Sequence, residues 1–142
     1  MLSALAENPE RITSLFLTDR LNEWGILAVH IWKNGERKEV VMDDYFPCED
    51  GDPCFSKANG NELWVLMLEK AWAKLHGSYE RIEAGHAHNV MNDLTGAPSF
   101  DLAMIDEDSE VVVEGLFERL CEADKRNYMM AASAGSTEAS AD

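Results

Sequence analysis

The sequence predicts an α+β domain, on the basis of one strongly amphipathic helix, one β-hairpin and an ordinary globular composition. The 142 residues are 46% hydrophobic and 8% aromatic. A chain of this length and composition is long enough to bury a core as one domain.

The helix is predicted from Asn61 to His76. Apolar side chains recur there at i, i+3, i+4, i+7, i+8 and i+11, which places them on one face that must be buried; they are Trp64, Met67, Leu68, Ala71, Trp72 and Leu75. The opposite face carries Glu62, Glu69 and Ala73, with Lys70 and Lys74 on its border. Asn59 and Glu62 have the spacing of an N-cap and its reciprocal carboxylate, and Gly77 can supply the left-handed residue that ends the helix.

The earlier elements are predicted in chain order. Residues 1–9 favour a short helix without an N-cap, as if a helix had been entered part way along, and the helical pattern continues from Ile12 to Phe16. Trp24 to Trp32 and Arg37 to Met42 are rich in β-branched and apolar residues, and Asn34-Gly35 between them predicts a tight hairpin turn. Asp43-Asp44 ends the second strand, and the acidic segment 48–53 is expected to be a loop.

The later part of the chain has an internal boundary. Thr95-Gly96-Ala97-Pro98 combines Gly and Pro and breaks any preceding element. Beyond an acidic stretch, residues 111–127 have helical spacing, and Tyr128 to Ser133 can form a strand. From Ser133 onward small and polar residues dominate, so an ordered fold is not expected there.

The net charge argues against two kinds of partner, and the cysteine content bears on the cellular location. Twelve Lys and Arg stand against 27 Asp and Glu, a net charge of -15, which repels nucleic acid and anionic membranes. Such an excess serves solubility or divalent cation binding, and charge alone favours solubility. Three cysteines, Cys48, Cys54 and Cys121, form an odd set, and no signal peptide or long apolar run is found, so we expect free thiols and an intracellular, cytoplasmic location.

The histidines give weak signals. His30 lies inside the first predicted strand, and the sequence places no acid or nucleophile beside it, which favours a packed or rim residue. His86-Ala87-His88 could hold a metal, but it lies on a predicted loop with no third ligand at a defined offset, so exposed histidines are expected.

Several segments resemble the catalytic core of calpain-type cysteine proteases. Asn61 to Trp64 reads N-E-L-W, and Glu69 to Glu80 reads E-K-A-W-A-K-L-H-G-S-Y-E, similar to the family's N-E-x-W and L-E-K-A-x-A-K-x-x-G-S-Y-E. In the same order, residues 40–47 are similar to V-V-x-D-D-x-x-P, and Asn92 to Gly96 to E-D-x-T-G. The resemblance covers most of the chain, from Leu2 to about Ser133.

This resemblance implies a papain-like core, represented by its first half and the start of its second. Residues 1–96 would form the first core subdomain, 97–134 the start of the second, and 135–142 a poorly ordered tail. The family activity is calcium-regulated cleavage of intracellular proteins through an acyl-enzyme, with protein or peptide substrates. Gly85 matches the second glycine of the family's S-G-G stretch beside the substrate, where Ala84 replaces the first. Glu62 matches a calcium ligand.

The catalytic triad has no match in the sequence. A cysteine protease needs a thiolate, an activating histidine and an orienting group. The family's cysteine stands just before a segment similar to Leu2 to Ala6, and its histidine and asparagine belong to stretches beyond those matched here. We therefore expect no catalytic residue, no peptide cleavage and an incomplete calcium site in this chain. Two alternatives remain open: a non-catalytic calpain-like binding or regulatory module, and an unrelated acidic interaction domain.

Overall fold

The computed structural model describes residues 2–20, 22–57, 60, 62–82, 87–102 and 113–132. The chain divides into two compact units, Met1–Leu102 and Ala103–Asp142. Two helices precede two antiparallel two-stranded sheets, and the remaining helices follow them, so the predicted α+β class is confirmed.

The hairpin of the first unit joins β1 (Ile26–Lys33) to β2 (Glu36–Asp43) in an antiparallel register that pairs Val29 with Val40. Asn34 and Gly35 both have positive φ, 53° and 77°, as a two-residue turn matched to the strand twist requires. The predicted hairpin is confirmed. Its first strand begins two residues later than predicted, since Gly25 has a φ of 62° and Trp24 before it is 75% exposed.

Residues 15–18 cover the outer edge of β1. The amides of Leu17 and Thr18 donate to the Ala28 carbonyl at 2.9 and 3.3 Å, and the His30 amide donates to the Leu15 carbonyl at 2.7 Å. The helix predicted as far as Phe16 is therefore wrong in its last residues: α2 (Pro9–Thr13) ends earlier, and Phe16 forms a bridge with Val29.

The first two helices are short. α1 spans Leu2–Ala6, and α2 follows after Asn8, whose side chain accepts a hydrogen bond from the Glu10 amide at 3.0 Å. Pro9 at the start of α2 has no amide hydrogen to satisfy, which suits the first turn of a helix. The single predicted helical stretch is thus two helices separated by a capping residue.

The central helix α3 (Trp64–His76) ends as predicted and begins differently. Gly77 has a φ of 105°, and its amide donates to the Ala73 carbonyl at 2.8 Å. Leu63 holds the N-cap position without a side-chain bond. The predicted pair of Asn59 and Glu62 is therefore wrong as the cap of this helix; Asn59 itself lies outside the described residues.

Both sides of α3 are covered. Leu68 and Ala71 belong to the predicted apolar face and are buried, but so are Leu66 and Ala73, which project from the opposite side at about 100° per residue. The prediction that Ala73 belongs to the exposed face of the helix was wrong, because this side of α3 is buried as well. Trp64 and Trp72 keep part of their surface exposed but are mostly buried, as expected of this face.

A second, very short hairpin replaces the predicted acidic loop. β3 (Cys48–Glu49) pairs with β4 (Asp52–Pro53), and the segment after it is fixed to α3. There the amide and hydroxyl of Ser56 donate to the Glu69 carboxylate at 3.0 and 2.7 Å, and Phe55 stacks on Tyr79 with ring centroids 4.3 Å apart.

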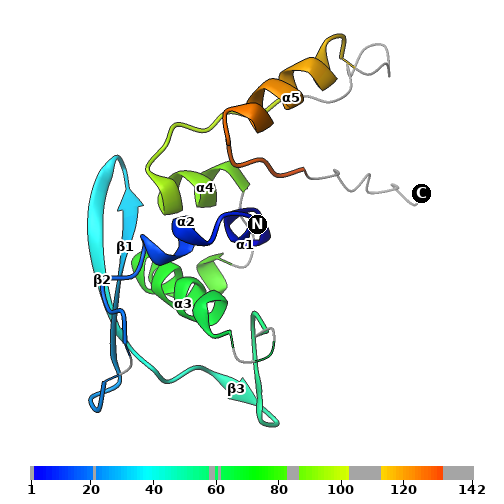
Figure 1. Ribbon diagram of the computed structural model, residues 1–142. Helices are drawn as coiled ribbons and strands as arrows, with labels where there is room; N and C mark the ends of the chain where they lie inside the picture. The colour runs from blue at the N-terminus through cyan, green and yellow to red at the C-terminus, as the bar shows by residue number, and fades with distance from the viewer. Residues whose placement is uncertain are drawn as a thin grey trace, which may run out of the picture. The chain divides into compact units, whose positions relative to one another are not determined.

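The core lies between one face of the hairpin and the helices. Figure 1 shows α3 and α4 (Ala87–Thr95) on the same side of β1 and β2, and both helices contact β1. A 3-10 turn, η1 (Glu80–Ile82), joins them after α3. The buried apolar residues of the described chain all belong to this unit: Leu5, Leu15, Leu27, Val29, Ile31, Val40, Met42, Leu66, Leu68, Ala71, Ala73, Val90 and Leu94.

The described part of the second unit, residues 113–132, contains one helix, α5 (Leu116–Lys125). Two of its apolar side chains are open to solvent, with Phe117 75% and Leu120 40% exposed. The strand predicted from Tyr128 is not formed over residues 128–132, where the Tyr128 amide instead donates to the Ala123 carbonyl at 2.9 Å. The predicted tail lies outside the described residues.

Candidate functional site

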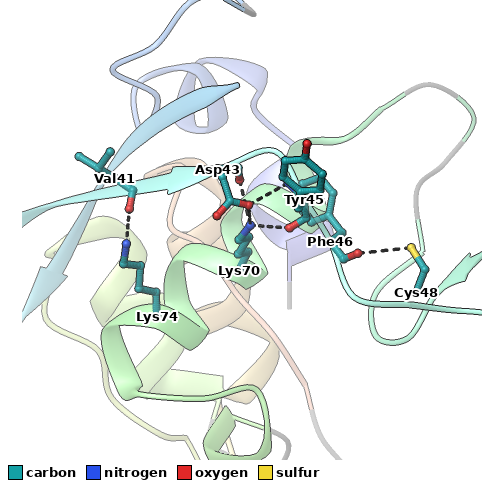
Figure 2. A network of polar contacts seen from close by, with 7 residues as sticks. All are labelled: Val41, Asp43, Tyr45, Phe46, Cys48, Lys70 and Lys74. Carbon is teal, nitrogen blue, oxygen red and sulfur yellow. Dashed lines mark hydrogen bonds and ion pairs between the residues drawn. The ribbon is translucent and has the colours of Figure 1, made fainter. Parts of the chain in front are cut away.

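Two lysines of α3 bind the end of β2, as Figure 2 shows. Lys70 Nζ lies 2.9 Å from the Asp43 carbonyl oxygen and 2.5 Å from its Oδ1, and it also donates to the Tyr45 carbonyl. One turn further along, Lys74 Nζ donates to the Val41 carbonyl at 2.6 Å. Because the side chain of Lys70 is only 16% exposed, its ammonium depends on these oxygens in place of water.

This contact changes the titration of Asp43. The hydrogen bond from Lys70, followed by the bond from the Tyr45 amide, holds the pKa of the Asp43 carboxyl below its usual range. Close by, burial first and the charge of Glu69 second raise the pKa of Tyr79. The end of β2 therefore favours an ionised carboxylate, and the helix beside it favours a neutral phenol.

A second polar cluster gathers around Asp93 of α4. Oδ2 of Asp93 accepts a hydrogen bond from Trp72 Nε1 at 2.8 Å and lies 3.0 Å from His76 Nε2. Lys33 Nζ lies 3.7 Å from the same oxygen and 3.0 Å from His76 Nε2. The Asp93 side chain is only 14% exposed, and the polar atoms of Trp72, His76 and Lys33 lie within 3.7 Å of its Oδ2.

This Asp93 cluster forms one wall of a cavity of about 390 Å³ in the first unit. The hairpin turn contributes Asn34, η1 contributes Arg81 and α4 contributes Asn89 and Asn92. Trp32 lines it beside Gly96, where an added Cβ would lie 2.5 Å from the indole ring. The cavity is thus polar, with aromatic walls and two cationic side chains.

Glu62 and His88, the predicted ligands that the structure describes, do not line this cavity. Glu62 is exposed just ahead of α3, and Gly85 and His86 lie outside the described residues. His88 belongs to α4, so the predicted loop at this position is wrong; its Nδ1 lies 3.0 Å from Asp101 Oδ2. In the described part of the chain, no group of three or more His, Cys, Asp or Glu side chains could hold a metal ion.

The three cysteines are free, as predicted. Cys48 and Cys54 lie exposed on or beside the β3–β4 hairpin, and Cys48 Sγ is 3.5 Å from the Phe46 carbonyl oxygen. Cys121 lies within α5 and is partly exposed. His30 is partly buried within β1, in agreement with a packed or rim residue.

The sequence model described as calpain family cysteine protease matches residues 1–142. The chain belongs to the calpain family of cysteine proteases. Its mixed α+β architecture fits a fragment of the papain-like calpain core, as the resemblance implied.

Three similar proteins are 43–48% identical to the chain over the aligned residues. The chain is 46% identical over 107 residues to the calpain-type cysteine protease ADL1 of Oryza sativa subsp. japonica, covering 72% of this chain and 5% of that protein. It is 48% identical over 99 residues to the calpain-type cysteine protease DEK1 of Arabidopsis thaliana, covering 67% and 5%, and 43% identical over 74 residues to calpain-10 of Rattus norvegicus, covering 51% and 11%. The alignments thus span about a tenth or less of each relative.

The calpain-like segments of the sequence meet in space. Lys70 and Lys74 come from the segment 69–80, and the oxygens that they bind come from the segment 40–47. Asp93, from the segment 92–96, accepts a hydrogen bond from Trp72 of the segment 69–80. Sequence reasoning noted these segments one by one and missed the polar clusters between them; two lysines four residues apart beside an apolar helix face were the available signal.

No helix among the described residues combines the length and the apolar character needed to cross a membrane.

Proposed function

We propose that this chain is part of a calcium-dependent calpain-type endopeptidase that cleaves intracellular proteins through an acyl-enzyme. The observation that carries the proposal is the match of the calpain family to residues 1–142, together with the contacts that join its characteristic segments. Three free cysteines accord with a reducing, cytoplasmic location.

The chain supplies framework to that enzyme. Residues 1–96 form the first core subdomain, residues 97–134 begin the second and residues 135–142 form a tail. In the first subdomain, the hairpin and α3 make the rigid layer on which a substrate cleft is built. Gly85 is proposed to lie beside the substrate backbone, where the lack of a side chain permits close approach.

The chain by itself is proposed not to cleave peptides. An acyl-enzyme requires a thiolate beside a histidine. Cys48 and Cys54 are exposed on or beside the β3–β4 hairpin, and Cys121 lies within a helix rather than at its start. The test incubates the purified chain with calcium, a fluorogenic peptide and a thiol-directed inhibitor. No turnover is expected. Calcium-dependent turnover that the inhibitor blocks and Cys121→Ser abolishes would show an unrecognised nucleophile.

Glu62 is proposed as one ligand of the family's calcium site. Calcium takes six to eight oxygen ligands, and one exposed carboxylate supplies at most two, so this chain alone is expected to bind calcium weakly or not at all. Calorimetry of the chain and of Glu62→Gln tests this. Micromolar binding that the substitution removes would show a more complete site in this chain.

The reading frame that encodes the chain distinguishes the endopeptidase from a non-catalytic calpain-like module. A cysteine codon directly before the Leu2 segment, with a Gly-His-Ala-Tyr-like stretch after Asp142, supports the endopeptidase. An open frame that extends on both sides without either feature supports a module that binds proteins without cleaving them.

A further inference from the structure

We propose that the cavity between the hairpin turn, α3, η1 and α4 binds a carboxylate group, presented by an acidic peptide side chain or by a small free dicarboxylate. The proposal concerns residues 32–35, 72–81 and 89–93 of the first unit, and it does not depend on proteolysis. It follows from the charges that line the cavity and from the hydrogen-bond donors that they leave available.

The charges favour an anion. Lys33 and Arg81 both line the cavity, and the carboxylate that faces them, Asp93, already accepts from Trp72 Nε1 and lies within 3.0 Å of His76 Nε2. The chain as a whole carries a net charge of -15, whereas this cavity is lined by two cations and by one carboxylate that already has a hydrogen-bond donor. At ordinary ionic strength the remaining acidic surface is screened beyond about 8 Å.

The donors of the two cations are not exhausted. An ammonium carries three N–H donors and a guanidinium five. The Arg81 guanidinium makes one long hydrogen bond, from Nη1 to the His76 carbonyl oxygen at 3.5 Å, and is exposed. The Lys33 ammonium contacts His76 and Asp93, and its side chain is 32% exposed. Both groups can therefore donate to a carboxylate in the cavity, with charge-assisted bonds.

His76 gives such binding a distinct signature. Its Nε2 lies 3.0 Å from the Lys33 ammonium, which can only donate, and 3.0 Å from the Asp93 carboxylate, which can only accept. A neutral ring can bond to one of these through Nε2 but not to both. When Lys33 turns to a bound carboxylate, Nε2 is released to carry the proton and donate to Asp93. Binding is thus coupled to the tautomer of His76.

The aromatic walls of the cavity are held in place by contacts with their neighbours. Trp32 is fixed against Gly96, and Trp72 is held by its bond to Asp93 and by an edge-on contact with His76 at 4.9 Å. Asn34, Asn89 and Asn92 add amide groups at the rim. A short acidic side chain fits this combination of rigid rings and amides better than a large apolar ligand does.

The test is an NMR titration of the full chain with N-acetyl-aspartate N-methylamide and with its asparagine counterpart at about 150 mM salt, near the physiological ionic strength. Saturable shifts of the Trp32 and Trp72 indole N–H signals and of the Arg81 side-chain signal are expected with the aspartate compound alone. The ring nitrogen shifts of His76 should move toward the Nε2–H tautomer. Malonate is titrated separately, and binding of malonate alone would identify a free dicarboxylate as the source of the group.

Two variants locate the site. Arg81→Gln should weaken binding about tenfold, since loss of a charge-assisted hydrogen bond costs at least a factor of that size. Arg20→Gln removes an exposed cation elsewhere, whose side chain is 87% exposed, and should leave the affinity unchanged. Equal shifts with the aspartate and asparagine compounds, no shifts with any compound, or equal weakening in both variants would overturn the proposal.

Discussion

Lys70 of α3 holds Asp43 at the end of β2 through both the main chain and the side chain of that residue. Its Nζ lies 2.9 Å from the carbonyl oxygen and 2.5 Å from Oδ1. One half-buried ammonium thereby fixes where the strand ends and how the chain leaves it. This contact joins the helix to the hairpin over 27 residues of sequence.

Replacing Lys70 with Met is expected to lower the free energy of unfolding by about 1–2 kcal/mol, because hydrogen bonds to a charged group are lost while the aliphatic packing is kept. Urea unfolding followed by tryptophan fluorescence measures the change. Lys57→Met, at an exposed position, is the control and should leave the midpoint within error. Identical midpoints for the two variants would show that the Lys70 contact contributes nothing to stability.

Asp43 should contribute to stability in a pH-dependent way. Its folded-state pKa is lowered below 3.8, first by the bond from Lys70 and then by the Tyr45 amide. The contribution is therefore complete above the unfolded pKa and is lost as the pH falls through the folded value. Asp43→Asn should flatten the acid limb of the stability curve below about pH 4. In a Lys70→Met background the same substitution should have a smaller effect, and an undiminished effect would assign the lowered pKa to another cause.

Gly96→Ala should destabilise the first unit strongly. Gly96 has a φ of 68°, and a Cβ there would lie 2.5 Å from the Trp32 ring. Strain and overpacking together predict a loss of about 2–4 kcal/mol. Gly35→Ala separates the two effects, since Gly35 has a φ of 77° but nothing within 4 Å of an added Cβ. Thermal unfolding should show the smaller loss for Gly35→Ala, and equal losses would exclude the contact with Trp32 as a cause.

Asp93→Ala should cost about 2–3 kcal/mol, because the indole N–H of Trp72 and the ammonium of Lys33 lose a largely buried acceptor. Asp93→Asn keeps an oxygen that can accept from Trp72 and should cost less. Urea unfolding measures both losses, and the Trp72 indole N–H signal should shift in Asp93→Ala. If alanine and asparagine cost the same, the charge of Asp93 rather than its bond to Trp72 is what matters.

Local signals in the sequence were sufficient for the hairpin and for the end of α3. Asn34-Gly35 specifies a turn with two positive φ values, and Gly77 specifies a left-handed cap, so each is determined by neighbouring residues. The start of α3 was less well predicted, because the polar residues before it suit a cap or a loop equally. The burial of Ala73 depends on tertiary packing around the second side of α3, which the periodicity of the helix does not reveal.

The polar clusters depend on tertiary structure and were not predicted. Lys33, His76 and Asp93 are separated by 43 and 17 residues in sequence, and only the packing of β1, α3 and α4 brings them together. Lys70 was placed on the border of a helix face, which is correct, but its partners on β2 follow from the way the hairpin docks. The strand predicted from Tyr128 is not formed over residues 128–132, since strand formation depends on cross-strand neighbours rather than on the segment's own residues.

The lysines of α3 have a further consequence for β2, beside which the described residues form no third strand. The carbonyls of Val41 and Asp43, two residues apart in β2, accept from Lys74 and Lys70, and the Tyr45 carbonyl just beyond the strand also accepts from Lys70. Exposed strand carbonyls are templates on which another chain can add a strand and start aggregation. By binding these oxygens with side chains from a helix, the protein closes this stretch of the sheet edge to intermolecular pairing without adding a strand.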